Sequence, residues 1–314
     1  MIEHLRGRER ALEPLGWTGR EAEWIALVCL HSGVFTRAQF CFHFDSRRNR
    51  ATRFVQALKD QRSAVEWSDP LSVNGRSRIC LISGKPIYRA LGAGIIRHRR
   101  WGSIHAAMRR LLSLDFVLEH PGMGWLPTEA EKVEFFEGLG VDRRLLPRRV
   151  YYGAVGARRR YFALKLPVAV DARTVTFVYV DPGHRTDSEL RSFGSAHGRL
   201  WDTVREQGRQ VRVIGIGAGQ ESIERAERVL RRWAATAPGK PSEGVTVRQE
   251  IKEIDDAIHH HDDEFLAQYG GFMGAVRRSV ELQRLPEAKI PEGVSINDYS
   301  TWQATRFAGP EEAP

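Results

Sequence analysis

The hydrophobic positions near the start of the chain recur with the spacing of a helix in three successive stretches. Residues 17–33 and 34–44 each contain a threonine with Glu or Gln three residues later, which is the pattern of a capping box. The third stretch, 45–60, has an apolar stripe that a folded helix would bury, made of Ala51, Phe54, Val55 and Leu58. We expect Asp45 or Ser46 to cap its first turn with a side-chain oxygen.

The pattern changes after this third helix. Residues 64–82 contain two short β-prone runs separated by Asn74-Gly75, a pair that favours a tight hairpin turn. A further helix follows in "GKPIYRALG", with Pro86 near its first position. Three helices followed by a hairpin is the order of a winged helix-turn-helix, in which the third helix enters the major groove and the hairpin contacts the DNA backbone. The pattern therefore predicts such a domain over residues 1–99.

Beyond residue 99 the pattern predicts helices first and an α/β arrangement afterwards. Residues 100–150 are interpreted as a helical connector, with a helix capped by Thr128 and Glu131. Buried strands are predicted at 174–181 and 210–217, each followed by a helix, and this alternation implies parallel pairing. We assign 151–237 to a small α/β domain. Residues 238–314 are assigned to a helical extension, broken at Gly270-Gly271, and an irregular tail.

Positive charge is concentrated in the N-terminal third of the 314-residue chain, whose formal net charge is +9. Residues 1–116 contain 20 Lys and Arg against 10 Asp and Glu, whereas 117–314 contain 28 against 29. A local positive field suits a polyanion such as nucleic acid. Arginine outnumbers lysine, which suits bidentate contacts to phosphate and guanine, although a genome of high GC content would also produce this bias.

This charge coincides with the third helix and the hairpin. The predicted DNA-binding residues are Arg47, Arg48, Asn49, Arg50, Arg53 and Gln56 of the helix, Arg76 and Arg78 of the hairpin, and Arg97, Arg99 and Arg100 after it. Asn49, Arg53 and Gln56 lie opposite the apolar stripe and are expected to reach base edges, whereas the hairpin arginines are expected to contact phosphate. Arginines at a helix start oppose the helix dipole, so they do not serve helix stability.

Two aspartates define a nuclease alternative. Asp171 ends the stretch "RRRYFALKLPVAVD" (158–171), which offers short strands, and Asp181 ends the predicted strand 174–181. Two carboxylates on adjacent strands can hold a divalent metal for phosphodiester hydrolysis. The cation expected two residues after the second acid is missing, since Gly183 stands there and His184 and Arg185 are out of register. The site is therefore interpreted as incomplete, and each aspartate as a cap of the turn after its strand.

Other chemistry-bearing stretches favour structural roles, so we predict no cofactor and no metal. "GIGAGQ" (215–220) lacks the GxGxxG spacing and is interpreted as a strand-to-helix turn. "HHHDDE" (259–264) is interpreted as a polar helix in which only His260 and Glu264 share a face. The three cysteines form no CxxC and are expected to be buried thiols: Cys29, Cys41 and Cys80. The longest apolar run near the N-terminus is too short to span a membrane, which favours a cytoplasmic protein without a membrane partner.

The layout resembles the replication-relaxation family of plasmid and integrative-element proteins. The resemblance is carried by "RRNRATRFVQAL", "CLISGKPIYRALG", "LDFVLEHPGMGWLPTEAEK" and "TVTFVYVDPG…LRSFG", within residues 17–235. It implies an N-terminal DNA-binding domain and a C-terminal domain similar to restriction-endonuclease cores. It further implies a role in replication or mobilisation of a mobile genetic element.

The predicted fold class is therefore mixed α+β and α/β, with a winged helix-turn-helix, a small α/β domain and a helical extension. We expect a non-enzymatic protein that binds double-stranded DNA, as a replication or mobilisation accessory factor or a transcription regulator of a mobile element. Its C-terminal domain is expected to contact another protein of the same element or a second copy of the chain, as a homodimer. Two alternatives stay open: a metal-dependent PD-(D/E)xK-type endonuclease using Asp171 and Asp181, and a protein-interaction module without DNA contact.

Overall fold

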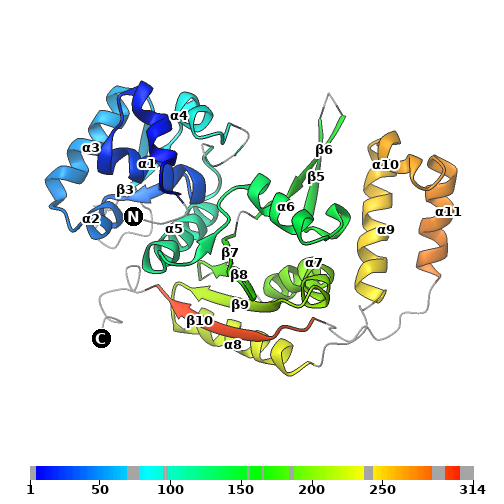
Figure 1. Ribbon diagram of the computed structural model, residues 1–314. Helices are drawn as coiled ribbons and strands as arrows, with labels where there is room; N and C mark the ends of the chain where they lie inside the picture. Colours follow the sequence, from blue (N-terminus) through cyan, green and yellow to red (C-terminus); the bar gives the residue numbers. More distant parts are fainter. Residues whose placement is uncertain are drawn as a thin grey trace.

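The computed structural model describes residues 5–68, 78–94, 96, 98, 100–153, 156–164, 166–183, 187–236, 243–284 and 294–304 (Figure 1). Over these residues the chain has a mixed α+β fold with three sheets. An N-terminal unit of helices and a small sheet is followed by a central five-stranded sheet, a projecting two-stranded hairpin and a group of C-terminal helices (Figure 1).

The N-terminal unit contains the three helices and the antiparallel strand pair that the hydrophobic pattern predicts. Its elements are η2 (Arg8–Leu15), α1 (Gly19–His31), β1 (Val34–Thr36), α2 (Arg37–Phe44), α3 (Arg48–Asp60), β2 (Ala64–Ser68), β3 (Arg78–Ile82) and α4 (Lys85–Ala90). The short strand β1 was not predicted; it pairs with β3 and gives the sheet order β1-β3-β2. The predicted hairpin tip, Asn74-Gly75, lies outside the described residues.

The predicted helix caps differ in outcome. The capping boxes at Thr36 with Gln39 and at Thr128 with Glu131 are confirmed. Thr18 is the N-cap residue of α1, but its side chain makes no capping hydrogen bond, so the box predicted there is wrong. The cap predicted for α3 is also wrong, because its N-cap residue is Arg47. Asp45 instead ends α2 as its C-cap residue in the left-handed conformation, with φ 45°.

The apolar stripe of α3 is buried as predicted, in an aromatic cluster. Ala51, Phe54, Val55 and Leu58 are each at most 1% exposed. The ring of Phe54 stacks on Phe40 of α2 with centroids 4.9 Å apart and meets Trp17 edge-on at 5.9 Å. This packing fixes which face of α3 is turned towards solvent.

The central sheet has the order β10-β9-β8-β7-β4. Its strands and helices are β4 (Gly124–Trp125), β7 (Val168–Val170), β8 (Thr174–Asp181), α7 (Asp187–Glu206), β9 (Gln210–Gly217), α8 (Gln220–Ala235) and β10 (Asp298–Gln303). The predicted parallel component is confirmed, because β8 pairs with β9 and β9 pairs with β10 in parallel. The predicted irregular tail is wrong at 298–303, where the chain returns to the sheet as its edge strand β10.

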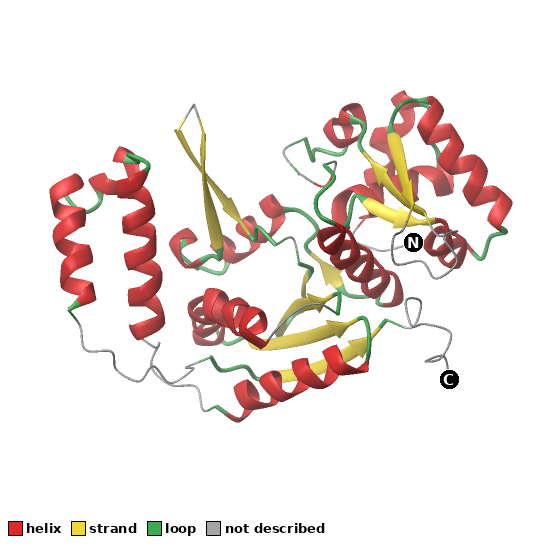
Figure 2. Ribbon diagram, turned by 180° about the vertical axis from the view of Figure 1, so that it is seen from behind, coloured by secondary structure: helices red, strands yellow, loops and turns green. Residues whose placement is uncertain are grey.

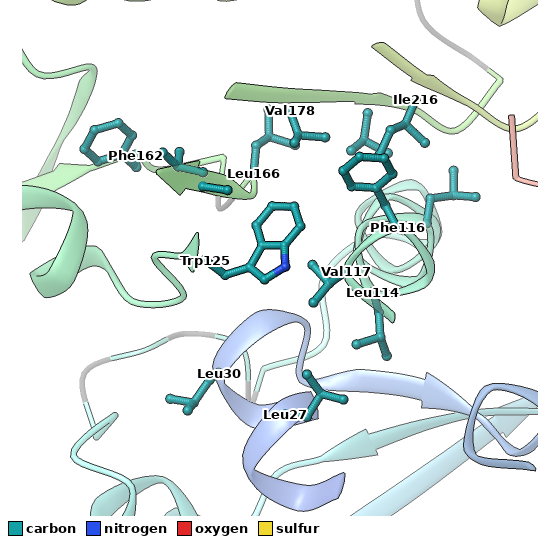
Figure 3. Close-up of a cluster of buried hydrophobic side chains, with 14 of the residues drawn as sticks. Leu27, Leu30, Leu114, Phe116, Val117, Trp125, Phe162, Leu166, Val178 and Ile216 are labelled. Atoms are coloured by element: carbon teal, nitrogen blue, oxygen red, sulfur yellow. The ribbon is translucent and has the colours of Figure 1, made fainter. Parts of the chain in front are cut away.

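Helix α5 (Ile104–Glu119) joins the N-terminal unit to the central sheet. Its residues Met108 and Leu111 pack against β1 and β3. Further along, Phe116 meets the ring of Trp125 on β4 edge-on, with centroids 5.9 Å apart. Figure 3 shows Trp125 between leucines of α1 and apolar residues of the sheet, so one hydrophobic core continues from the N-terminal unit into the sheet.

The C-terminal helices form a small unit with its own core beside a basic hairpin (Figure 2). The helical unit consists of α9 (Glu243–His259), α10 (Asp263–Ala267) and α11 (Phe272–Gln283). The hairpin consists of β5 (Arg148–Gly153) and β6 (Gly156–Tyr161), and it follows α6 (Glu129–Gly138) and η4 (Arg143–Leu145) along the chain. The predicted break at Gly270-Gly271 is confirmed, with φ 81° and 88°. The helix predicted through "HHHDDE" is interrupted, because α9 ends at His259 and His261 has φ 51°.

The cysteines follow the prediction for two of three positions. Cys29 and Cys80 are fully buried, while Cys41 is half-buried, and all three are free thiols. Burial raises the pKa of the Cys29 and Cys80 thiols. Within the described part of the chain, no helix has both the length and the apolar character needed to cross a membrane.

A cavity of about 350 Å³ lies between the base of the β5–β6 hairpin and the central sheet. His197 of α7 lines it beside Phe177 and Phe193 and is only 7% exposed. Its Nδ1 lies 2.8 Å from the carbonyl oxygen of Phe193. Burial, and secondarily the charge of Lys132, lower the pKa of His197 to about 4.

The fold should therefore lose stability in mild acid through His197. A histidine in the unfolded chain has a pKa of about 6.5 and becomes protonated below that pH. In the folded chain His197 stays neutral until about pH 4, so protonation between these values favours the unfolded state. Lowering the pH from about 7.5 to 5.5 should cost about 1.4 kcal/mol through this residue. Urea unfolding at both pH values should show a smaller difference in His197→Phe, and an unchanged difference would contradict this role.

Candidate nucleic-acid interface

Helix α3 presents a basic face to solvent because its apolar stripe is buried. All six polar residues predicted to contact DNA from this helix are exposed: Arg47, Arg48, Asn49, Arg50, Arg53 and Gln56. Thr52, which the sequence reasoning omitted, is exposed with them and donates from Oγ1 to the carbonyl oxygen of Arg48 at 3.1 Å. The helix thus offers several donors on one side and none of them is needed for the core.

The arginines at the start of α3 have no acidic partner in the described part of the chain. The ion pairs between described residues include none with Arg47, Arg48, Arg50 or Arg53. The first turn of α3 contains no acidic residue. The positive end of the helix dipole lies at the same place, so the charges and the dipole reinforce each other as an anion-attracting site.

Two polar contacts set how the rest of α3 is held. Gln56 donates from Nε2 to the Asp60 carboxylate at 2.7 Å, so this contact must open before Gln56 can reach a base. Glu66 of β2, whose side chain is 4% exposed, accepts ion pairs from Arg37 at 2.7 Å and from Lys59 at 3.3 Å. This buried carboxylate ties α2 and α3 to the hairpin and keeps their relative position.

The arginines predicted outside α3 have different placements. Arg78 is exposed at the start of β3, opposite Ser68 in the antiparallel register. Arg100 is exposed, and the ring of the next residue, Trp101, lies 4.2 Å from that of Trp67 on β2. Arg100 therefore lies near the end of β2 from which the chain enters the hairpin turn. The described residues do not include three of the predicted arginines: Arg76, Arg97 and Arg99.

The segment around Arg100 is anchored by a buried arginine. Arg110 of α5 is 9% exposed and donates to the carbonyl oxygens of Ser32, His98 and Arg100. Burial lowers its pKa to about 10, so it stays charged at neutral pH. Gly33 makes this contact possible, because it has φ 74° and a Cβ there would lie 2.5 Å from the carbonyl oxygen of His98.

The two aspartates of the nuclease alternative do not converge. Asp171 lies in the β7–β8 turn, where its Oδ1 accepts from the backbone N–H groups of Arg173 and Thr174 at 2.7 Å each. Asp181 is the last of the eight residues of β8, and the first, Thr174, lies beside Asp171. The seven steps from Thr174 to Asp181 span about 23 Å at the usual rise per strand residue, far beyond the reach of a shared metal. The two acids stay apart because β7 and β8 form an antiparallel hairpin, with Asp171 at its turn and Asp181 at the far end of β8.

Asp181 is held in a structural contact. It is 2% exposed, accepts from the backbone N–H of Gly183 at 2.9 Å and forms an ion pair with Arg225 of α8 at 3.2 Å. Its predicted role as the cap of the turn after the strand is confirmed, and Asp171 has the same role in its own turn. His184 and Arg185 lie outside the described residues. Among the residues that are described, no cluster of three or more His, Cys, Asp or Glu could hold a metal.

The glycine-rich turn 215–220 connects β9 to α8, as the sequence predicts. Close packing of α8 on β9 explains two of its glycines. A Cβ on Gly217 would lie 2.4 Å from the hydroxyl of Ser222, and one on Gly215 would lie 2.9 Å from Ala226. Small residues are therefore required for α8 to pack closely on the strand.

A second basic element escaped the sequence reasoning. The β5–β6 hairpin contains five arginines, Arg148, Arg149, Arg158, Arg159 and Arg160. The net charge of residues 117–314 gave no sign of these arginines, because that region as a whole is close to neutral. The runs "RRVYY" and "ARRRY" were the signal that could have revealed a basic hairpin.

No protein-family model, curated protein or solved structure matches this chain. The resemblance to the replication-relaxation family therefore stays a prediction. The candidate interface is defined by its own geometry: the exposed face of α3, Arg78 at the hairpin and Arg100 beside it.

Proposed function

We propose that this protein binds double-stranded DNA through a winged helix-turn-helix in residues 1–99, with α3 in the major groove and the β2–β3 hairpin on the backbone. One observation carries the proposal. The four arginines at the start of α3 are exposed and form no ion pair among the described residues, on a helix whose opposite face is fully buried. No acid among the described residues compensates their charge, and a phosphate backbone would supply the missing anions.

The order of the elements supports the same docking geometry. Helix α1, strand β1, helices α2 and α3 and then the β2–β3 pair follow one another, and the three strands form one antiparallel sheet. In a winged helix this order leaves the third helix and the hairpin available to the same duplex. The ion pairs of Glu66 with Arg37 of α2 and Lys59 of α3 hold these helices against β2, which favours a fixed position of α3 relative to the hairpin.

We further propose that the C-terminal part is a non-enzymatic domain similar to restriction-endonuclease cores. Its support is the mixed sheet, in which the β7–β8 hairpin is followed by α7, β9 and α8. The separation of Asp171 from Asp181, and the pairing of Asp181 with Arg225, argue against metal-dependent hydrolysis by these two acids. A role as an accessory factor or regulator of a mobile genetic element rests on the family resemblance.

The proposal is tested by titrating the full-length protein into labelled duplex DNA at several salt concentrations. Each phosphate contact should contribute about −0.9 to the slope of log affinity against log salt. We expect a slope of about −4 or steeper, because four exposed arginines, Arg47, Arg48, Arg50 and Arg78, would contact phosphate. Absence of binding at low salt would refute the proposal and favour a protein-interaction module.

Base-reading and phosphate-contacting residues should be separable. Asn49 and Arg53 lie on the face of α3 opposite the apolar stripe, so Arg53→Ala should reduce the preference for the cognate sequence by about 1–3 kcal/mol. Arg78→Ala should weaken binding to every sequence alike. The measurement compares selected and random duplexes of equal length. Equal losses on both for Arg53→Ala would reverse the assigned roles.

The purified protein should not cut DNA in magnesium or manganese. Hydrolysis of this class needs carboxylates that share a metal and a cation near the attacked phosphate, and the two aspartates lie at opposite ends of β8. Supercoiled and linear DNA are incubated with each metal, with Asp181→Ala in parallel. Metal-dependent cleavage that disappears in Asp181→Ala would promote the endonuclease alternative.

A further inference from the structure

The β5–β6 hairpin projects from the central sheet as a two-stranded ribbon between the N-terminal unit and the C-terminal helices (Figures 1 and 2). Its antiparallel register divides its side chains between two faces. Arg148, Val150 and Tyr152 share one face with Tyr161 and Arg159, which are the cross-strand partners of Arg148 and Val150. Arg149 and Tyr151 share the other face with Arg160 and Arg158. The two faces differ in how far acidic residues compensate their arginines.

The first face is held and neutralised by the C-terminal helices. Arg148 forms an ion pair with Glu253 of α9 at 2.6 Å, and both side chains are under 20% exposed. Arg159 forms one with Asp262 at 3.0 Å, on the turn before α10. The ring of Tyr152 stacks on His260 with centroids 3.7 Å apart. These contacts hold the hairpin against α9 and the turn before α10, and its other face is turned away from them.

The second face keeps its positive charge. Arg149 and Arg158 are both exposed, and neither forms an ion pair with any described residue. Arg149 lies directly opposite Arg160 in the strand pair. Arg160 forms an ion pair with Glu129 at 3.3 Å. Like charges opposite each other destabilise a strand pair, so hairpin stability does not account for them. Tyr151, opposite Arg158, is 37% exposed on the same face.

We propose that the face formed by Arg149, Tyr151 and Arg158 is a second contact for duplex DNA, made with a different duplex segment from the one bound at α3. A two-stranded ribbon fits a DNA groove, and its arginines would contact phosphates on either side. The ribbon is braced from behind by ion pairs at Arg148 and Arg159, so it enters the contact without losing much conformational freedom.

The placement of the two basic elements requires two DNA segments. Figures 1 and 2 both show α3 at the outer edge of the N-terminal unit, with the bulk of that unit between α3 and the hairpin. The buried stripe of α3 faces that bulk, so its basic face is turned away from the hairpin. The protein would therefore bridge two duplexes, or two distant sites on one. The bridging part rests on the proposed function of α3.

The experiment compares four forms of the full-length protein: the wild type, two variants and a matched control. The hairpin variant combines Arg149→Ala and Arg158→Ala, and the α3 variant combines Arg47→Ala, Arg50→Ala and Arg53→Ala. The control is Arg143→Ala with Arg144→Ala, which removes two exposed arginines that are already paired with Glu137 and Asp142. Binding to a random duplex is measured against salt by fluorescence anisotropy. Bridging is measured by capture of a labelled duplex on beads that carry a second duplex.

We expect the hairpin variant to bind random duplex about tenfold more weakly, with a salt slope smaller by about two, because two phosphate contacts are lost. Bridging should be lost in both the hairpin and the α3 variants and kept in the control. Thermal unfolding should match the wild type in each case. If the hairpin variant binds and bridges like the control, or if wild type binds single-stranded DNA through this face in preference to duplex, the proposal is overturned.

The same set separates failure of the two proposals. Loss of binding in the hairpin variant, with wild-type binding by the α3 variant, would refute the α3 assignment and keep the hairpin contact. Loss in the α3 variant, with wild-type behaviour of the hairpin variant, would refute the hairpin contact alone. A charge-preserving form, Arg149→Lys with Arg158→Lys, should recover most of the nonspecific affinity, because phosphate contacts depend mainly on charge.

Discussion

Replacing Arg47, Arg50 and Arg53 together by alanine should weaken duplex DNA binding about 100-fold or more at about 0.15 M salt. All three side chains are exposed, and none forms an ion pair among the described residues. Their removal would take away up to three contacts to DNA and much of the local positive field. The salt slope should fall by about one for each lost phosphate contact. Fluorescence anisotropy with a labelled duplex measures both quantities.

A matched control separates this effect from loss of net charge. Arg143, Arg144 and Arg231 are also exposed, but each is already paired with an acid, so their triple alanine variant should bind nearly as wild type. The α3 variant should unfold at or slightly above the wild-type temperature, because arginines at a helix start oppose the dipole. Wild-type affinity in the α3 variant would refute the assignment of this helix.

Phe54→Ala should destabilise the N-terminal unit by about 3–5 kcal/mol. Phe54 is 1% exposed, and its ring contacts those of Phe40, Phe35 and Trp17, with centroids between 4.9 and 6.0 Å apart. The alanine would leave a cavity that these large rings cannot close without shifting α2 and α3. Because α3 carries the basic face, DNA binding should fall at temperatures where the variant begins to unfold.

Urea unfolding followed by tryptophan fluorescence measures this loss, since Trp17 and Trp24 lie in the same unit. The control is Thr52→Ala, an exposed position on the same helix, which should change the free energy of unfolding by about 0.5 kcal/mol or less. A change below about 1 kcal/mol for Phe54→Ala would mean that α3 does not depend on this cluster.

Much of the N-terminal unit and its candidate site followed from local pattern alone. The spacing of Ala51, Phe54, Val55 and Leu58 predicted the buried face of α3, and that face in turn predicted which arginines would be exposed. The capping boxes at Thr36 and Thr128 and the parallel pairing of β8 with β9 were also predicted. Each of these features depends on residues within a few positions of one another, or on the right-handed connection between consecutive elements.

Features that depend on contacts between distant segments were decided only by the tertiary structure. Whether Asp171 and Asp181 could share a metal depended on the direction of β7 relative to β8, and the antiparallel turn put them at opposite ends of one strand. The edge strand β10 forms against Arg212–Gly217 after a long helical excursion, so its own residues gave little sign of it. The arginines of the β5–β6 hairpin differ in role because distant segments pair only some of them. Acids of α6, α9 and the turn before α10 pair with Arg160, Arg148 and Arg159, respectively. Among the described residues, no acid pairs with Arg149 or Arg158. Local sequence determines which residues can form a helix or carry charge, whereas long-range packing determines which of those charges are compensated.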